Sequence, residues 1–335
     1  MIEIRGLDSD FNICALLDPV NIQWNTKYYE YGNCIIQIPI SQYSTDIQYI
    51  YSSDRRELGV VKKMNYETDV NNFKYVILNC YFYENELNRE IVNPTFQGNG
   101  NTEDEITRMV VANKGDITLT VATSQGRGTD TLFSDLGTEL AEQCYYILKL
   151  HEMSFKVDYD LLTNEFIFSI FEGLDRTQEQ SDNEPLTFST EFDNLESPTL
   201  LIDDSSYKTH ALLIVKDGYE NQTVSIDDTI SVKKWTTIDC SSVEYIDTDA
   251  NYYADVKAYG LSALKASFAS KVSVSGDAVA ASYTYLKDYS CGDKCNLVIS
   301  ELGIVVETRI IEVNEVFKDN EHTITLQFGD KIIEE

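Results

Sequence analysis

The sequence predicts an α+β protein in which strands dominate and more than one domain is present. Short runs of alternating apolar and polar residues, separated by turn residues, fill both ends of the chain. Helix-like periodicity is confined to the middle and to one segment ahead of the last strands. The chain has 335 residues and exceeds a typical single domain, so about two to four domains are expected. Strands at both ends with helices between them are typical of the α+β class.

The first hundred residues predict a series of strands joined by turns. Runs such as "NICALLD", "NCIIQIPI" and "FKYVILNCYFY" are rich in β-branched and aromatic residues. Gly32 and Asn33 are predicted to form the tip of a hairpin. Further on, Thr102 and Glu105 have the spacing of a capping box ahead of Ile106, which predicts a short helix.

Residues 129–152 contain the clearest helical pattern. Apolar residues recur there at every fourth position and would share one helix face, namely Leu132, Leu136, Leu140, Cys144 and Leu148. A β-hairpin is expected next, over residues 154–171, because apolar residues alternate on both sides of a turn near Thr163 and Asn164.

The second half of the chain predicts a linker, a helix and a final group of strands. Residues 172–198 are polar and rich in turn formers, so the chain is expected to pass between domains there. Residues 249–270 predict a helix despite Gly260. Strands should follow, including one over residues 279–290, and the last strand should place Ile324, Leu326 and Phe328 on one face.

The charge of the chain excludes some classes of partner. The 56 acidic and 26 basic residues give a formal net charge of −30, which opposes binding to the phosphate backbone of nucleic acid. We therefore expect no stable nucleic-acid binding. The first residues show no basic leader followed by an apolar run, and no stretch of about 18 apolar residues occurs. Folding in the cytoplasm without membrane insertion is expected.

The cysteines raise the question of a metal or redox site. Seven cysteines are scattered along the chain, an odd number that indicates free thiols in a reducing compartment. Cys291 and Cys295 flank a Gly-Asp-Lys turn, but their C-x3-C spacing lacks the second pair of ligands that structural zinc needs. We expect Cys291 to be a turn residue and Cys295 a small core residue.

No motif predicts catalysis. His151, His210 and His322 lack a neighbouring nucleophile motif, although a triad brought together by folding stays open. The acidic pairs and clusters are expected to be solvated surface: Asp203-Asp204, Asp227-Asp228 and Glu103-Asp104-Glu105. The glycine pairs are expected to be turns rather than phosphate cradles: Gly98 with Gly100, and Gly126 with Gly128. We predict a protein that is not an enzyme, with no catalytic, cofactor-binding or metal residues.

Several stretches resemble one family. They are "GLDRT" (173–177), "LTFSTEFDNL" (186–195) and "DSSYKTHALLIVKDG" (204–218), with "YYEYGNCIIQIPI" and "RRELGVVKKM" near the start and residues 287–330 at the end. In this order they are similar to tail hub proteins of phages and phage tail-like particles of Gram-positive bacteria, including siphovirus tail proteins and the central baseplate hub of contractile tails.

The resemblance implies a domain plan. Residues 1–98 would form an N-terminal tube-like β-barrel, completed by strands from about 186–240; residues 99–185 an α+β middle domain; residues 186–240 linking strands; and residues 241–335 a helix with a C-terminal β-barrel. Many tail-tip relatives carry a long C-terminal extension that cleaves peptidoglycan. The sequence ends just after the last predicted strand, which implies a compact hub without a built-in hydrolase, closer to a contractile particle.

The resemblance also implies a structural role without cofactors. A homotrimer would present six similar barrels to the hexameric tail tube and keep three-fold symmetry for a spike or tip, thus acting as a symmetry adapter that lines the channel. The implied partners are the tail tube or distal tube-initiator protein, the spike or tip, the tape measure protein and other baseplate proteins, in a virion or tail-like particle. Two alternatives stay open: a tail-tip cell-wall hydrolase and a glycan-binding tail adhesin.

Overall fold

The computed structural model describes residues 2–227, 229–241, 243, 249–279, 282–318 and 321–329. Strands take up 45% and helices 17% of the structure, so the predicted β-dominated α+β class is confirmed. The described strands do not form a closed barrel, and the two-barrel arrangement stays a prediction. No described helix has the length and apolar character needed to cross a membrane.

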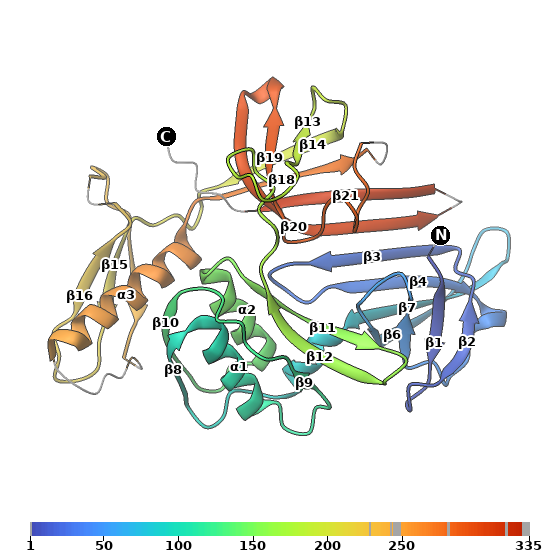
Figure 1. Cartoon of the computed structure of the whole chain (residues 1–335), viewed down its shortest axis with the longest axis horizontal. Coiled ribbons are helices and arrows are strands. Elements are labelled where there is room, and N and C mark those ends of the chain that lie inside the picture. The colour runs from blue at the N-terminus through green and yellow to red at the C-terminus, as the bar shows by residue number, and fades with distance from the viewer. Residues whose placement is uncertain are drawn as a thin grey trace.

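A sheet of thirteen strands runs through most of the molecule (Figure 1). Its N-terminal part contains β1 (Ile4–Leu7), β2 (Ile13–Leu17), β3 (Asn21–Lys27), β4 (Asn33–Pro39), β5 (Tyr49–Tyr51), β6 (Gly59–Thr68) and β7 (Lys74–Phe82). Its C-terminal part contains β13 (Thr187–Ser189), β14 (Leu195–Asp203), β18 (Lys271–Ala278), β19 (Lys294–Ile299), β20 (Ile304–Lys318) and β21 (Glu321–Gly329). The short 3-10 helices η1 (Ile40–Gln42) and η3 (Ser300–Leu302) lie at strand ends.

Strand β20 joins the two parts of this sheet. Its first half, from Ile304 to Arg309, pairs with β19, and its second half, from Glu312 to Lys318, pairs with β3. Strand β21 pairs with both halves, across a register shift between Ile310 and Glu312. One continuous strand is therefore shared by the two parts of the sheet, which we call the N-terminal sheet and the C-terminal sheet.

Each part of the sheet has its own hydrophobic core. The N-terminal core contains Trp24, Ile36 and Phe82 and receives Phe317 from β20. The C-terminal core is formed by β18–β21 and their neighbours. As predicted, three alternating residues of β21 are buried there together: Ile324, Leu326 and Phe328.

The middle of the chain forms a third unit with the largest core. Its elements are η2 (Tyr83–Arg89), β8 (Phe96–Asn101), α1 (Thr102–Asn113), β9 (Thr120–Val121), β10 (Asp130–Asp135), α2 (Leu140–Leu150), β11 (Ser154–Asp160) and β12 (Glu165–Phe171). The predicted hairpin of β11 and β12 is confirmed, and Asn164 in its turn has a φ of 53°.

The helix predicted over residues 129–152 is only partly correct. Helix α2 begins at Leu140, whereas Leu132 lies in β10, where it pairs with Asn99 of β8. Gly137, with a φ of +91°, separates the strand from the helix. The four-residue spacing of Leu132 and Leu136 was therefore coincidental, because pairing with β8 decided the local structure.

Two smaller predictions need correction. Helix α1 is capped by Asn101 instead of Thr102, since the Asn101 side chain accepts hydrogen bonds from the amides of Glu103 (3.0 Å) and Asp104 (3.3 Å). The strand predicted over residues 279–290 is a loop in its described part, residues 279 and 282–290. There Asp288 accepts a hydrogen bond from the Thr284 amide (2.7 Å), which stabilises a turn.

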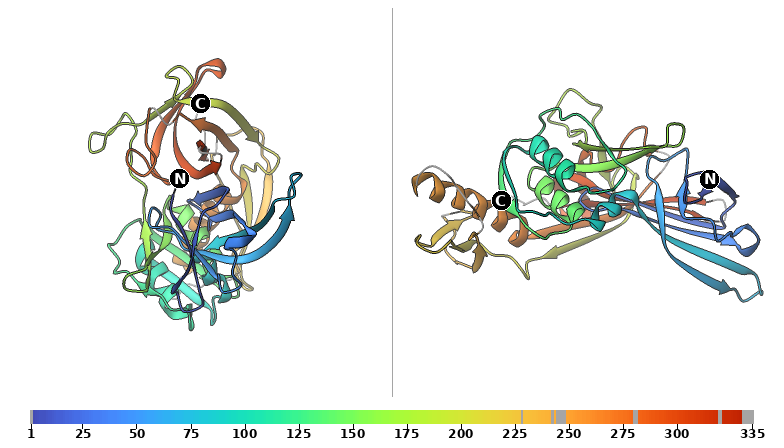
Figure 2. Two further views of the ribbon diagram at one scale, coloured as in Figure 1. Left: turned by 90° about the vertical axis from the view of Figure 1, so that its right-hand side faces the viewer. Right: turned by 90° about the horizontal axis from the view of Figure 1, so that it is seen from below.

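A fourth unit has a separate small sheet, which contains β15 (His210–Ile214), β16 (Gln222–Ser225) and β17 (Trp235–Asp239). The predicted helix is confirmed as α3 (Asp249–Phe268), and it packs on this sheet around a core that includes Leu213, Val256 and Leu264. Figure 2 shows this unit and the N-terminal sheet at opposite ends of the molecule. The domain borders named above stay predictions.

Replacing Asn101 by Ala is expected to lower the free energy of unfolding by about 1 kcal/mol, because the first amides of α1 lose their acceptor. Asn101→Asp keeps the acceptor and should lose less, as measured by urea denaturation. Both variants lose the hydrogen bonds that the Asn101 side-chain amide donates to the carbonyls of Gly126 and Gly128. An equal loss of stability in both variants would therefore assign the whole effect to these bonds and contradict the cap.

Candidate functional site

The candidate functional site is a junction of polar and charged side chains, all buried or half-buried apart from Glu152, where the N-terminal sheet, the middle unit and the C-terminal sheet meet. Figure 1 shows the chain leaving β12 and running between the lower and upper parts of the molecule toward β13. The side chains that form the junction are Tyr28, Arg55, Arg56, Glu57, Glu84, Glu152, Asp158, Arg176, Asp293, Lys294, Arg309 and Glu315.

The turn that holds the two cysteines, "SCGDKC" (290–295), is part of the junction. Gly292 has a φ of +101°, its amide donates to the carbonyl of Ile310 (2.7 Å), and a Cβ there would lie 2.5 Å from the Tyr28 ring. Only glycine fits this position. As expected, Cys291 lies in the turn and Cys295 is a core residue with 0% exposure. Burial raises the pKa of both thiols, which disfavours the reactive thiolate.

Asp293 joins this turn to the "GLDRT" stretch. The Asp293 carboxylate, 3% exposed, accepts hydrogen bonds from the Leu174 amide (2.8 Å), the Ser290 amide (3.0 Å) and Arg176 Nε (3.0 Å). The backbones are also paired, since Lys294 N donates to Leu174 O (2.8 Å) and Arg176 N donates to Lys294 O (3.0 Å). Two segments that are far apart in sequence thus form one structural unit.

Gly173 allows this close approach. A Cβ at Gly173 would lie 1.7 Å from the carbonyl oxygen of Gly292. The amide of Gly173 donates to the hydroxyl of Tyr28 (3.3 Å), and that hydroxyl donates to the carbonyl of Glu152 (2.9 Å). Arg309 lies over the Tyr28 ring at 5.0 Å and binds the Glu152 carboxylate (3.1 Å). Tyr28 therefore contacts all three larger units.

The "RREL" stretch (55–58) contributes two arginines to the junction, and each of them pairs with carboxylates. Arg55 donates two hydrogen bonds to the Glu315 carboxylate (2.9 and 2.6 Å), which is 1% exposed. Arg56 lies 3.3 Å from Glu57 and 3.5 Å from Asp158 of the middle unit. Both arginines are thus engaged by carboxylates inside the protein.

Glu84 is a buried carboxylate of the junction whose hydrogen bonding is incomplete. One carboxylate oxygen accepts a hydrogen bond from the Val157 amide (3.1 Å), while the other is buried without a hydrogen-bond partner among the described residues. Burial raises the pKa of Glu84 to about 7, although the positive charge of Arg56 opposes the shift.

Folding does not bring the three histidines together. The three histidines lie in separate places: His151 bonds to Thr129 (3.1 Å), His210 to Thr209 (2.8 Å), and His322 to Glu315 (3.0 Å). The described residues contain no group of three His, Cys, Asp or Glu side chains arranged to hold a metal ion.

The acidic clusters are only partly exposed. Glu103 is buried and paired with Arg127 (2.9 Å), so the solvated prediction is wrong there, whereas Asp104 is exposed. Asp204 and Asp227 are exposed and Asp203 is half-buried, and Asp228 lies outside the described residues. The turn predicted for Gly98 and Gly100 is wrong, because both lie in strand β8, where Gly98 packs against the Phe133 ring. Gly126 and Gly128 lie in a loop and have positive φ.

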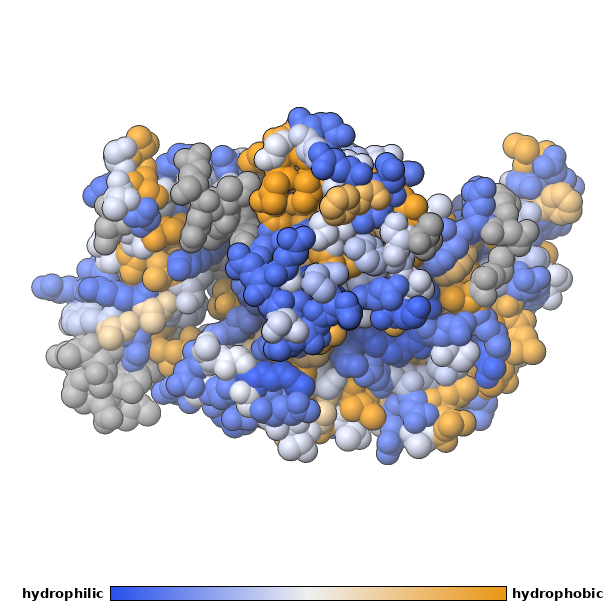
Figure 3. Space-filling model, turned by 45° about the horizontal axis from the view of Figure 1, so that its top comes forward, coloured by the Kyte–Doolittle hydropathy of each residue, from blue (hydrophilic) through white to orange (hydrophobic). Residues whose placement is uncertain are grey.

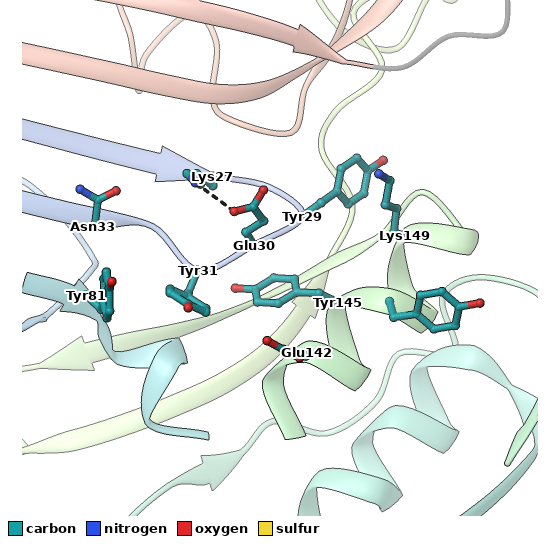
Figure 4. A pocket seen from close by; sticks show the side chains of 10 residues that line it. Lys27, Tyr29, Glu30, Tyr31, Asn33, Tyr81, Glu142, Tyr145 and Lys149 are labelled. Carbon is teal, nitrogen blue, oxygen red and sulfur yellow. Dashed lines mark hydrogen bonds and ion pairs between the residues drawn. The ribbon is translucent and has the colours of Figure 1, made fainter. Parts of the chain in front are cut away.

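A pocket lies beside the junction, between the β3–β4 loop and helix α2 (Figure 4). Its volume is about 510 Å³. We call it the tyrosine pocket because five tyrosines line it: Tyr29, Tyr31, Tyr81, Tyr145 and Tyr146. The remaining lining side chains are polar: Lys27, Glu30, Asn33, Glu142 and Lys149.

Sequence reasoning missed the charged residues of the junction. A signal was present for Glu315, because it alternates with Val313 and Phe317 and so shares their apolar strand face, whereas Glu84 is followed by the polar residues Asn85 and Glu86 and gives no such signal. A charged residue at a core position needs a buried partner. The identity of that partner could not be predicted, since Arg55 and Glu315 are 260 positions apart.

Replacing Asp293 by Ala is expected to lower the free energy of unfolding by about 3–5 kcal/mol, because the half-buried Arg176 and the amides of Leu174 and Ser290 would lose the carboxylate that accepts their hydrogen bonds. The matched control is Asp175→Ala, which removes an exposed carboxylate from the same segment and should cost far less. Thermal and urea unfolding would measure both. Equal losses would contradict the assigned role of Asp293.

The double variant Cys291→Ser, Cys295→Val should bind as little zinc as the wild type and still fold.

Replacing Glu84 by Gln is expected to stabilise the protein at pH 8 but not at pH 4.5. The folded-state pKa of Glu84 is raised to about 7 from an ordinary value near 4.5, so stability falls as pH rises between these values. The difference should approach about 3 kcal/mol. Urea midpoints of both proteins across pH 4.5–8 would measure it. A constant difference between the two proteins would contradict a buried, titrating Glu84.

Comparison with known proteins gives a family and a fold. The family model described as Siphovirus ReqiPepy6 Gp37-like protein matches residues 2–330. No curated protein matches the chain in sequence. The fold is similar to that of a tail protein from Neisseria meningitidis MC58, with a TM-score of 0.62 and 10% identity over 98% of this chain and 96% of that one.

Two further structures share the fold. The 43 kDa tail protein of prophage MuSo2 from Shewanella oneidensis has a TM-score of 0.62 and 12% identity over 97% of this chain and 98% of that one. The c3393 protein of E. coli, described as a type VI secretion component structurally similar to the T4 tail proteins gp27 and gp5, has a TM-score of 0.50 and 9% identity over 99% of this chain and 77% of that one. The chain therefore belongs to the siphovirus tail protein family described as Siphovirus ReqiPepy6 Gp37-like.

Proposed function

We propose that this tail protein is a structural hub that joins the tail tube to a trimeric spike or tip. The observation that carries the proposal is the sharing of β20 by two sheets. A symmetry adapter needs two tube-like units in each chain, held at a fixed mutual orientation. A continuous strand across both sheets, with the buried junction beside it, supplies such rigidity.

The proposed assembly is a homotrimer. Three chains with two units each present six units to a six-fold tube while the whole ring keeps three-fold symmetry. A closed ring of this kind requires head-to-tail contacts that return to the first subunit. We expect the tube or its distal initiator on one face and the spike or tip on the other. The tape measure protein and other baseplate proteins would be further partners, in a virion or a tail-like particle.

The likeness to the c3393 protein supports this proposal at the level of fold. The family and the similar tail proteins are also in line with a role that is not enzymatic. The described histidines lie at separate places and do not form a common site, which does not favour a hydrolase.

The acidity of the chain fits passage of DNA through the ring. Each chain carries a formal charge of −30, and the trimer would carry three times that. The face shown in Figure 3 is largely hydrophilic, with its apolar residues in separate patches. Acidic groups on the channel wall would repel nucleic acid and prevent it from adhering. A channel wall that proves neutral or basic in the assembled ring would contradict this part of the proposal.

The hub proposal predicts a trimer at the end of the tube. Mass photometry of the purified protein should give three times the chain mass of 38.1 kDa. Electron microscopy of intact particles should place three copies between the tube and the spike. A monomer in solution, together with no density for this chain at the tube end, would overturn the proposal.

A further inference from the structure

We propose that the tyrosine pocket is a binding site for a neutral saccharide. This inference does not rest on the hub proposal, because it uses only side chains of a single chain. The pocket is formed by the end of β3, the β3–β4 loop, the start of β4, the end of β7 and helix α2. A volume of about 510 Å³ suits a small ligand.

The aromatic surfaces of the pocket are held in place. Tyr145 is 7% exposed and stacks on Phe155, with ring centroids 4.2 Å apart. Tyr31 and Tyr81 form an edge-to-face pair at 5.3 Å. Figure 4 shows Tyr31 and Tyr81 on one side of the pocket and Tyr145 beside them. Rings that are already ordered lose little entropy when a ligand binds, which favours binding.

The charges of the pocket favour an uncharged ligand. Lys27 is paired with Glu30 at 2.9 Å, and Lys149 lies 5.3 Å from the centre of the Tyr29 ring. With Glu142 on helix α2, the pocket contains two ammonium and two carboxylate groups, so its formal charge is zero. A phosphate or a free cation would meet as much repulsion as attraction.

The mixture of groups fits a sugar ring. The faces of a pyranose ring carry C–H groups that pack on tyrosine rings, while its edge carries hydroxyls. Carboxylates such as Glu30 and Glu142 accept hydrogen bonds from hydroxyls, and Asn33 can both donate and accept. Tyrosine also offers a hydroxyl next to an apolar ring. The pocket therefore provides both kinds of contact within one cavity.

An extended peptide is a less suitable occupant. Peptides commonly bind by adding a strand to an unpaired sheet edge. The strands at the pocket have no such edge, because β3 lies between β20 and β4, β4 between β3 and β7, and β7 between β4 and β6. A peptide would have to bind by its side chains alone.

The test is saturation-transfer NMR on the purified full chain with chitotriose, cellotriose and maltotriose. We expect at least one of these neutral trisaccharides to bind and Tyr81→Ala to weaken that binding at least about tenfold. Tyr81 is 44% exposed, so its removal should leave the fold intact. The matched control is Tyr66→Ala, which removes an exposed tyrosine of β6 outside the pocket and should leave binding unchanged.

Two results would overturn the proposal. One is the absence of binding by all three sugars at about 10 mM. The other is binding that Tyr81→Ala leaves as strong as in the wild type. Density for a partner polypeptide in the pocket of assembled particles, without sugar binding by the free chain, would instead assign the pocket to a protein interface. Trimer formation is measured separately, so failure of the hub proposal and failure of this one are distinguishable.

Discussion

The structure depends on one strand that belongs to two sheets. Successive residues of a strand face opposite sides, so β20 must match its pattern to two cores at once. Ile310 and Val313 enter the C-terminal core, whereas Phe317 enters the N-terminal one. Ile310 and Val313 are an odd number of residues apart and would face opposite sides of a regular strand, and the register shift between Ile310 and Glu312 allows both to enter the same core. A slip of one residue in β20 would therefore disturb both cores together.

The buried charges beside β20 restrict the arrangement more than they stabilise it. Taking a carboxylate and a guanidinium out of water costs about as much as their attraction returns, but leaving one of them unpaired is strongly unfavourable. Arg55 with Glu315, and Arg176 with Asp293, each connect segments that separate units contribute. We infer that these pairs select one relative placement of the sheets and the middle unit. Alternative placements would leave a charge buried without its partner.

Local patterns in the sequence were sufficient for the hairpin of β11 and β12 and for helix α3. They failed at β10, where a four-residue spacing suggested a helix but pairing with β8 imposed a strand. The junction was out of reach for a different reason. Arg176 and Asp293 are 117 positions apart, and no local pattern indicates that "GLDRT" and "SCGDKC" touch. Within "SCGDKC" only the cysteines have the spacing of a possible site, whereas Gly292 and Asp293 make the contacts with Tyr28 and "GLDRT".

The loop between β3 and β4 connects the junction to the tyrosine pocket. Tyr28 is buried in the junction, while Tyr29 and Tyr31 line the pocket. The loop packs closely on the neighbouring strands at Gly32, where a Cβ would lie 2.3 Å from the carbonyl oxygen of Asn25 and 2.7 Å from the Phe82 ring. The constraint that orients the sheets thus also fixes the aromatic wall of the pocket. A ligand bound there would hold the β3–β4 loop against α2, and so favour the same arrangement of units that the buried charges select.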